Sequence, residues 1–331
     1  MNPGVLALSG GGILACIAAG YGACLGIIIL REWNVAGGSE RQLALERKTY
    51  LVSVLLGWVM MFEFVSLFMF VHTADNLHGL FVGAMCAAGT LNVNEYGYPT
   101  LILKILNAVL CGLWMVIHHA DTRAPDYPLI RVKYTAVLII APLLFIENGV
   151  QIGYWMHLNP NVITSCCGIL FSTDSQIPAA DMANLPPAGT ITVFFLSLSG
   201  VLGTGIRFYR NGKGARLISA LSGWFFILAP ASVLSFISVY IYQLPTHHCP
   251  FCLLQREYGY IGYPLYVSLF VGGITGVGIG VLDRFKGIDS LQAVIPRIQY
   301  RLCLSALIGF ALFGAIAAYP MVFSDFTLIG Y

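Results

Sequence analysis

Eight runs of about 20 mostly apolar residues divide the chain, and this feature most constrains what it can fold into. A run of that length crosses a hydrocarbon core of about 30 Å as a helix, which satisfies its backbone polar groups without water. Only 10% of the 331 residues are charged, too few to cover a water-facing surface. The sequence therefore predicts an all-α integral membrane protein and excludes a disordered chain, a nucleic-acid-binding protein and a small secreted disulfide protein. The predicted spans are 5–30, 50–72, 100–118, 134–156, 189–207, 218–242, 262–282 and 301–320.

The basic residues are distributed unevenly among the connections between these spans. Of the 17 Lys and Arg residues, all but Lys104 and Arg256 lie in or beside the first, third, fifth and seventh connections. Because cytoplasmic loops carry an excess of Lys and Arg, these connections are predicted to be cytoplasmic and both termini to be on the outer side. Residues 1–331 are expected to form a single multi-pass domain in a bacterial inner membrane. The predicted outer loops are about 73–99, 157–188 and 243–261.

Reactive side chains gather in the three predicted outer loops. Disulfides form and persist on that side of a bacterial inner membrane, so cysteines there indicate redox or metal chemistry more than packing. Cysteines within the predicted spans are instead expected to be buried as small hydrophobic side chains. The outer-loop residues are Cys86, Cys166, Cys167, Cys249, Cys252, His72, His78, His157, His247 and His248, and the cysteines within spans are Cys16, Cys24, Cys111 and Cys303.

The segment 247–257 carries the most specific pattern, because its Cys-Pro-Phe-Cys sequence at 249–252 leads into the seventh span. Two cysteines separated by two residues can close a small disulfide that opens readily, and a helix start favours the thiolate of a nearby cysteine. Arg256 lies about one helical turn beyond Cys252, where it would stabilise a thiolate, hydrogen-bond a bound carbonyl or anchor the helix at the interface. The pattern predicts an exchangeable cysteine pair.

Residues 249–256, Cys-Pro-Phe-Cys-Leu-Leu-Gln-Arg, resemble the Cys-x-x-Cys-x-x-Gln-Arg signature of the DsbB family of quinone-dependent membrane disulfide oxidases. The resemblance implies an oxidoreductase that oxidises a periplasmic thiol protein and passes electrons to a membrane quinone. It assigns Cys249 and Cys252 to the pair beside the quinone. It assigns Arg256 to the quinone contact, and His248 and Gln255 flank the pair as further candidates for quinone binding.

The chain departs from that family in its number of helices and in the position of its other cysteines. Family members have four helices and a second cysteine pair after the third, whereas here no predicted outer cysteine follows Cys252. The partner cysteines would then lie upstream, as in the related vitamin K epoxide reductases. The candidates are Cys166 with Cys167, or Cys86, although a disulfide between neighbouring cysteines is strained.

The same segment also supports a metal site. Imidazole nitrogen and thiolate sulfur suit zinc or copper, so a transporter with a metal-capture site in its outer loops is one alternative function. The candidate ligands are His247, His248, Cys249 and Cys252.

A non-catalytic membrane subunit of a respiratory or cytochrome assembly is a further alternative, which would dock an electron-transfer partner. In that case His72 and His157, near the outer ends of their spans, are candidate ligands of a b-type haem. Covalent haem attachment is excluded at 249–252 because Leu253 stands where that motif requires histidine.

Three ionisable residues fall within the predicted spans: Glu63, Lys104 and Glu147. A charge inside a membrane is costly, so such residues usually pair or line a hydrated path. Glu63 and Lys104 are expected to form an ion pair between neighbouring helices. Glu147 could deliver protons to a quinone or be the proton site of a carrier.

Overall fold

The structure is a computed structural model that describes residues 2–34, 39–164 and 178–328. Within these ranges it has no strand, and eight helices are long and apolar enough to cross a membrane. The predicted all-α, eight-span fold is thus confirmed, and each helix contains its predicted run. The eight spans are Pro3–Glu32, Glu40–Leu80, Gly97–Asp121, Ile130–Met156, Pro187–Asn211, Ala215–Tyr242, Gly262–Asp283 and Val294–Phe323.

The chain, expected from its sequence to be one domain, divides into two compact units, and each is described by itself. Unit 1 comprises Met1–Thr73, Asn94–Leu158 and Phe285–Ile295. Unit 2 comprises Ala74–Val93, Asn159–Arg284 and Pro296–Tyr331.

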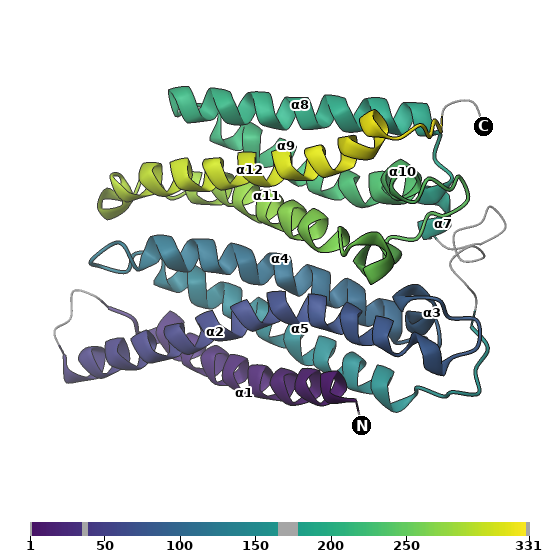
Figure 1. The fold of residues 1–331 in the computed structure, drawn as a ribbon. Helices are drawn as coiled ribbons and strands as arrows, with labels where there is room; N and C mark the ends of the chain where they lie inside the picture. Colours follow the sequence, from purple (N-terminus) through teal and green to yellow (C-terminus); the bar gives the residue numbers. More distant parts are fainter. Residues whose placement is uncertain (1, 35–38, 165–177, 329–331) are drawn as a thin grey trace. The chain divides into compact units, whose positions relative to one another are not determined.

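Unit 1 is built from four long helices, which Figure 1 draws in purple to blue-green: α1 (Pro3–Glu32), most of α2 (Glu40–Asn76), α4 (Gly97–Asp121) and α5 (Ile130–Met156). The α1 helix begins where the Asn2 side chain accepts a hydrogen bond from Gly4 N at 2.8 Å. It packs along α5 through small buried residues such as Ala15 and Ala19, which allow close approach of membrane helices.

A buried ion pair joins α4 to α5 at the turn between them. Lys133 Nζ lies 2.8 Å from Asp121 Oδ2, and neither side chain is more than 2% exposed. Asp121 Oδ1 also accepts a hydrogen bond from Leu129 N at 2.8 Å. The sequence counted Lys133 among the loop residues, but α5 begins earlier than predicted and Asp121 supplies the opposite charge that burial requires.

Unit 2 is built from α8 (Pro187–Asn211), α9 (Ala215–Ser232), α11 (Gly262–Asp283) and α12 (Val294–Phe323), of which α12 begins in unit 1. A π-helical turn, η2 (Val233–Ile237), and α10 (Ser238–Tyr242) continue α9. The α11 glycines allow close packing: a Cβ at Gly272 would lie 2.8 Å from the Phe310 ring and one at Gly273 2.4 Å from the Phe226 ring. Buried aromatic side chains fill the centre of the unit: Phe194, Phe225, Phe236, Phe310 and Phe313.

Short elements complete unit 2 and carry its reactive residues. They are η1 (His78–Leu80), α3 (Ala87–Leu91), α7 (Pro178–Ala183), η3 (Cys252–Leu254) and η4 (Arg256–Tyr258). The 74–93 segment, which holds η1 and α3, lies between α2 and α4 in the sequence but belongs to unit 2. Both α4 and α11 begin at the glycine of a Gly-Tyr-Pro sequence, Gly97 and Gly262 respectively.

Candidate functional site

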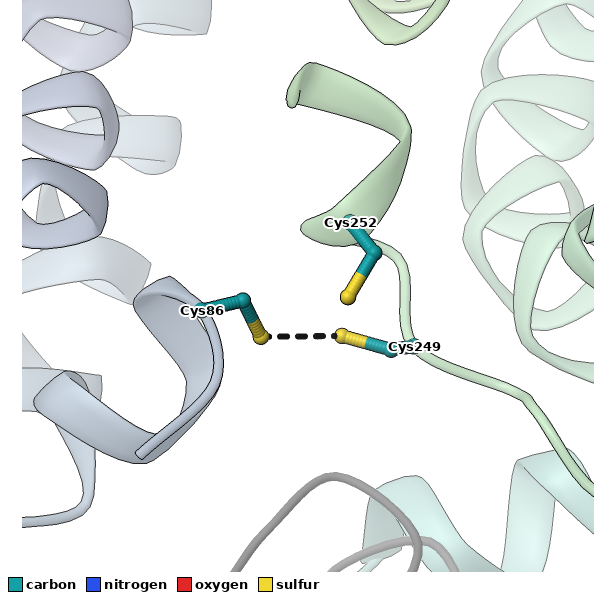
Figure 2. A group of neighbouring side chains, drawn as sticks. All are labelled: Cys86, Cys249 and Cys252. Atoms are coloured by element: carbon teal, nitrogen blue, oxygen red, sulfur yellow. Dashed lines mark hydrogen bonds between the residues drawn. The ribbon is translucent and has the colours of Figure 1, made fainter. Parts of the chain in front are cut away.

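Three cysteines from distant parts of the sequence meet inside unit 2. Figure 2 shows Cys86 facing Cys249 and Cys252, and the three Sγ atoms lie within 4.8 Å of one another. The sulfurs of Cys86 and Cys249 are 3.4 Å apart. Exposure is 0% for Cys86 and Cys249 and 4% for Cys252. These three residues are called the thiol cluster below.

The Cys86 side of the cluster is held by a carboxylate at the end of α2. Cys86 precedes the first residue of α3, and the next backbone N–H, that of Ala87, donates to Asp75 Oδ1 at 3.0 Å. Gln255 Nε2 donates to the same oxygen at 3.0 Å and to Met85 O at 3.1 Å. Asp75 and Gln255 therefore tie the Cys86 segment to the segment that carries the other two cysteines.

The 249–252 segment is held by hydrogen bonds to two consecutive carbonyl groups. Tyr242, at the end of α10, donates its hydroxyl to Cys249 O at 2.6 Å. Tyr266, in α11, donates to Pro250 O at 2.6 Å. His248 extends the anchoring, because its Nδ1 lies 2.7 Å from Leu234 O in the η2 turn. The backbone around Cys249 is therefore fixed from both sides.

The cysteine pair is not at the start of a membrane-spanning helix, and this corrects the sequence prediction. The α11 helix begins only at Gly262, and η3 and η4 fill the interval after Cys252. The chain cannot continue as an α-helix there because Gly259 and Tyr260 have φ values of +61° and +57°. The favourable charge effect of a long helix start on these thiols is therefore absent.

The three residues predicted to contact a quinone do not lie together around the cysteine pair. Arg256 is exposed on η4, and no contact between Arg256 and the thiol cluster is recorded among the described residues. Gln255 and His248 instead hold the backbone on either side of the pair. Neither His247 nor His248 adds a nitrogen ligand to the three sulfurs in the part of the chain that the structure describes.

His247 is nevertheless close to the cluster electrostatically. Burial lowers the pKa of His247, an effect that the Cys86 thiolate opposes and His248 reinforces. Its Nε2 is buried and has no hydrogen-bond partner among the described residues, and its ring lies 4.4 Å, centroid to centroid, from that of Tyr242. His247 is therefore a neutral imidazole at neutral pH, with one nitrogen available.

Tyr258 lies on the other side of Tyr242, with its ring centroid 4.4 Å away. Burial raises the pKa of Tyr258, and the neighbouring charges of Cys252 and Glu257 raise it further. Tyr258 lines an apolar cavity of about 660 Å³ in unit 2. Other lining residues are Ile241, Ile316, Tyr319 and Phe323.

The remaining predicted cysteines are distributed as follows. Cys166 and Cys167 lie outside the described residues. Thr164, two positions before Cys166 in the sequence, donates its hydroxyl to Gly89 O in α3 at 2.9 Å. Of the cysteines expected to be buried, three are buried, whereas Cys24 is exposed on α1. The buried three are Cys16, Cys111 and Cys303.

The two histidines considered as haem ligands are both exposed on unit 1. His72 lies on α2. His157 follows α5, with its Nδ1 2.8 Å from Gly153 O in that helix and its ring 5.2 Å from the ring of Tyr96.

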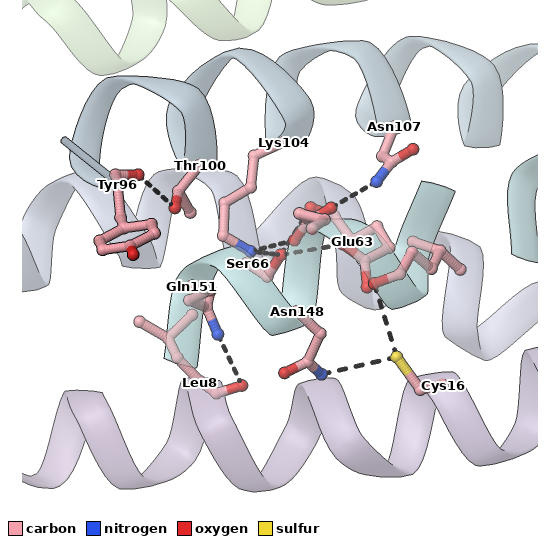
Figure 3. Close-up of polar contacts among 12 residues, drawn as sticks. Leu8, Cys16, Glu63, Ser66, Tyr96, Thr100, Lys104, Asn107, Asn148 and Gln151 are labelled. Atoms are coloured by element: carbon pink, nitrogen blue, oxygen red, sulfur yellow. Dashed lines mark hydrogen bonds and ion pairs between the residues drawn. The ribbon is translucent and has the colours of Figure 1, made fainter. Parts of the chain in front are cut away.

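The predicted intramembrane charges come together in unit 1, but with different partners from those expected. Lys104 Nζ lies 2.7 Å from Glu147 Oε1, so the direct ion pair joins α4 to α5 (Figure 3). Glu63 connects to Lys104 through Ser66, whose hydroxyl lies 3.1 Å from Lys104 Nζ and 3.3 Å from Glu63 Oε2. The expected Glu63–Lys104 pair is wrong because Glu147 lies on the neighbouring helix.

Several residues that hold the thiol cluster were not found from the sequence. Asp75, Tyr242 and Tyr266 lie in or beside apolar runs and belong to no motif. The closest signal was the outer-loop position of Cys86, which was predicted as one possible partner.

Comparison with protein-family models, with curated proteins and with solved structures found no match to this chain.

Proposed function

We propose that this protein is a membrane thiol–disulfide oxidoreductase whose thiol cluster exchanges a disulfide and passes electrons to a quinone. The observation that carries the proposal is the meeting of Cys86 with the Cys249/Cys252 pair, with two sulfurs 3.4 Å apart. At that spacing a thiolate of one cysteine can attack a disulfide that contains its neighbour. The outer-side thiol protein and the bacterial inner membrane are parts of the same proposal.

The exchange within the cluster is balanced in atoms and electrons. With a Cys249–Cys252 disulfide present, the Cys86 thiolate attacks the Cys249 sulfur, the Cys249–Cys252 bond breaks, and Cys252 leaves as a thiolate. A Cys86–Cys249 disulfide forms, and no electrons leave the cluster. When two thiols of the cluster close to a disulfide, two electrons and two protons are released, and a bound quinone would accept them.

The apolar cavity beside Tyr258 suits the ring of a quinone. It is lined mainly by aliphatic and aromatic side chains, with Gln243 and Ser324 as polar members, and its volume of about 660 Å³ is in the range of sites for small organic molecules. Tyr258 is protonated at neutral pH, as an ordinary tyrosine is, and its raised pKa reinforces this, so its hydroxyl can donate a hydrogen bond to a carbonyl oxygen. Arg256, the residue indicated by the family resemblance, is exposed on the same 3-10 turn.

His247 is our candidate for the base in the exchange. The nucleophile in thiol–disulfide exchange is the thiolate, so Cys86 must lose a proton before it attacks. His247 is neutral because burial lowers its pKa, and its Nε2 is available to accept that proton. The imidazolium that forms would then lie close to the thiolate and stabilise it.

Burial of the cluster limits which molecules can reach it. A thiol protein on the outer side cannot attack sulfurs that are 0–4% exposed, so a more accessible pair must pass electrons inward. Cys166 and Cys167, which lie outside the described residues, are the candidates that the sequence offers for that pair.

The test uses the full chain purified in detergent, with a reduced dithiol as donor and a soluble quinone as acceptor. Cys249→Ser and Cys252→Ser are each expected to reduce quinone-linked thiol oxidation to the background rate. Cys86→Ser is expected to stop steady-state turnover while prereduced Cys249 and Cys252 still close when quinone is added. Cys303→Ala is the matched control, because Cys303 is buried in unit 2 and belongs to another core cluster. Wild-type turnover in Cys249→Ser would reject the proposal.

The same geometry favours one second candidate, a soft-metal site. Three sulfurs that each lie about 2.3 Å from a central ion stand about 4 Å apart, close to the spacing in the thiol cluster. Thiolate ligands select Cu(I) or Zn(II). Stoichiometric Cu(I) binding that protects all three cysteines from alkylation, together with no quinone-linked turnover, would favour metal capture over thiol oxidation.

A further inference from the structure

Unit 1 contains a buried carboxylate cluster that the thiol chemistry does not use. The five residues that form it come from three helices and are all at most 4% exposed. Figure 3 labels four of them, Glu63, Ser66, Lys104 and Asn107, whose side chains point towards one another from α2 and α4. They are Glu63, Ser66, Lys104, Asn107 and Glu147.

The hydrogen bonds support a charged Glu147. Lys104 Nζ donates to Glu147 Oε1 at 2.7 Å, and Asn107 Nδ2 donates to Glu147 Oε2 at 2.6 Å. Both oxygens of this carboxylate are therefore matched by donors, one of them cationic. Glu147 and Lys104 together form a neutral, well-satisfied pair.

The carboxylate of Glu63 has weaker hydrogen-bond donors than that of Glu147. Its Oε2 accepts from the Ser66 hydroxyl at 3.3 Å, and that hydroxyl also approaches Glu63 O at 3.0 Å, although it has only one proton to donate. The neighbouring Glu147 carboxyl group also disfavours a negative charge on Glu63. Glu63 therefore lacks the donors and the positive charge that would stabilise its ionised form.

The sum of the charges in the cluster also indicates that one carboxyl group is protonated. The cluster has two carboxyl groups and one ammonium group, and the other buried lysine of unit 1, Lys133, is paired with Asp121. The other ionisable side chains near the two carboxyl groups are the thiols of Cys16 on α1 and Cys111 on α4, and neither supplies a positive charge. An uncompensated charge at this depth is costly, so one carboxyl group must bind a proton.

Buried amide oxygens lie next to the cluster on α4 and α5. Asn107 Oδ1 on α4, and Asn148 Oδ1 and Gln151 Oε1 on α5, are buried and accept no hydrogen bond within the described residues. Glu147 and Gln151 are four residues apart, so they lie on the same face of α5. The two α5 acceptors follow Glu147 towards the end of the helix at Met156, where water or hydronium donors would satisfy them.

We propose that Glu63 and Glu147 share one exchangeable proton at neutral pH, with Lys104 as the fixed counter-charge, so that unit 1 contains an intramembrane proton-binding site. The row of amide oxygens on α5 gives the proton a polar route to the helix end. The site stands on unit 1 alone and does not depend on the proposed thiol chemistry.

The test is infrared spectroscopy of the full chain in detergent at about pH 7, where an ordinary carboxyl group is ionised. We expect a carboxylic acid C=O band that shifts in D₂O, which shows both the proton and its exchange. Glu63→Gln should remove the band. Lys104→Met should increase it about twofold, because two carboxyl groups without a counter-charge both bind protons. Glu95→Gln, which changes an exposed glutamate, is the control and should leave the band unchanged.

The wild-type spectrum alone can overturn the proposal, so it does not depend on whether the variants fold. Absence of a protonated carboxyl band at neutral pH would contradict a shared proton. A band that persists in folded Glu63→Gln would assign the proton elsewhere. A band that appears only when sodium chloride is replaced by choline chloride would show that the site binds a sodium ion in place of the proton.

Discussion

Several polar side chains beside the thiol cluster bind the backbone of the segments that carry its cysteines. Tyr242 and Tyr266 hold two consecutive carbonyl groups, and Asp75 holds the N–H that follows Cys86. This arrangement fixes the positions of three sulfurs while it leaves their chemistry open to exchange. The exchange step therefore depends on nearby groups that can gain or lose a proton. His247 is such a group.

Stability should depend on the charge of His247. Burial lowers its pKa below the value of about 6.5 that it has in an unfolded chain. Between the two pKa values the unfolded chain binds more protons than the folded one, so the free energy of unfolding falls as the pH drops below about 6.5. His247→Gln should remove that part of the pH dependence, with a difference in slope of at most one proton. Chemical denaturation between about pH 5 and 8 measures it.

The control for this experiment is His157→Gln, because His157 is exposed and follows α5 in unit 1. It should leave the pH dependence of stability nearly unchanged. Identical pH profiles for wild type and His247→Gln would contradict a buried neutral imidazole.

At the scale of elements, the position of the cysteine pair depends on how closely η3 packs on α11. A Cβ at Gly262 would lie 2.9 Å from the carbonyl carbon of Leu253, which is backbone and cannot rotate away. Gly262→Ala should therefore destabilise the fold by about 1–3 kcal/mol and slow quinone-linked oxidation. Gly200→Ala in α8 is the matched control, since no atom lies within 4 Å of its added Cβ. Equal stability of the two variants would show that this contact is not tight.

The ion pair at the turn between α4 and α5 gives a second prediction for an element. Asp121→Asn leaves the Lys133 ammonium buried without its counter-charge, so we expect a loss of about 3–5 kcal/mol in the free energy of unfolding. Arg41→Ala breaks the Arg41–Glu32 pair, whose arginine side chain is 80% exposed, and should cost about 1 kcal/mol or less. Similar losses in both variants would mean that Lys133 finds another partner.

The spanning helices could be predicted from the sequence because each is a long apolar run, which has few alternatives in a membrane. Two local features could not be predicted from the sequence. The chain turns at 259–260 through positive φ angles, one of them at a tyrosine, which has no strong preference for that conformation. Burial of Lys133 depends on Asp121 across the turn, a partner that residue counting does not identify.

For the whole molecule, the orientation in the membrane is a prediction from the distribution of basic residues. An epitope tag at the N-terminus should be accessible to protease from the outer side of the cell, because the first and fifth connections carry the positive charges. A tag inserted at Gly212, in the fifth connection, should be accessible only after permeabilisation. The opposite pattern would place the thiol cluster on the cytoplasmic side and contradict the proposed oxidation of an outer thiol protein.

The candidate site could be predicted only in part from the sequence. The Cys249/Cys252 pair was recognisable from its spacing, and Cys86 was one of the possible partners. Cys86 reaches the pair because the 74–93 segment folds into unit 2. This is a long-range contact that no local sequence signal indicates. The pairing of Lys104 with Glu147 depends in the same way on which helices are neighbours.

The most direct test of the central claim is acid-quenched thiol trapping of the purified full chain, with peptide mapping of Cys86, Cys249 and Cys252 before and after addition of reductant and then of a quinone. We predict that each oxidised molecule carries either a Cys249–Cys252 or a Cys86–Cys249 disulfide, and that both forms are lost on reduction and recovered in proportion to the quinone added. If the three cysteines stay reduced when quinone is present, or stay blocked by a metal or a permanent bridge, the thiol cluster is not a redox centre.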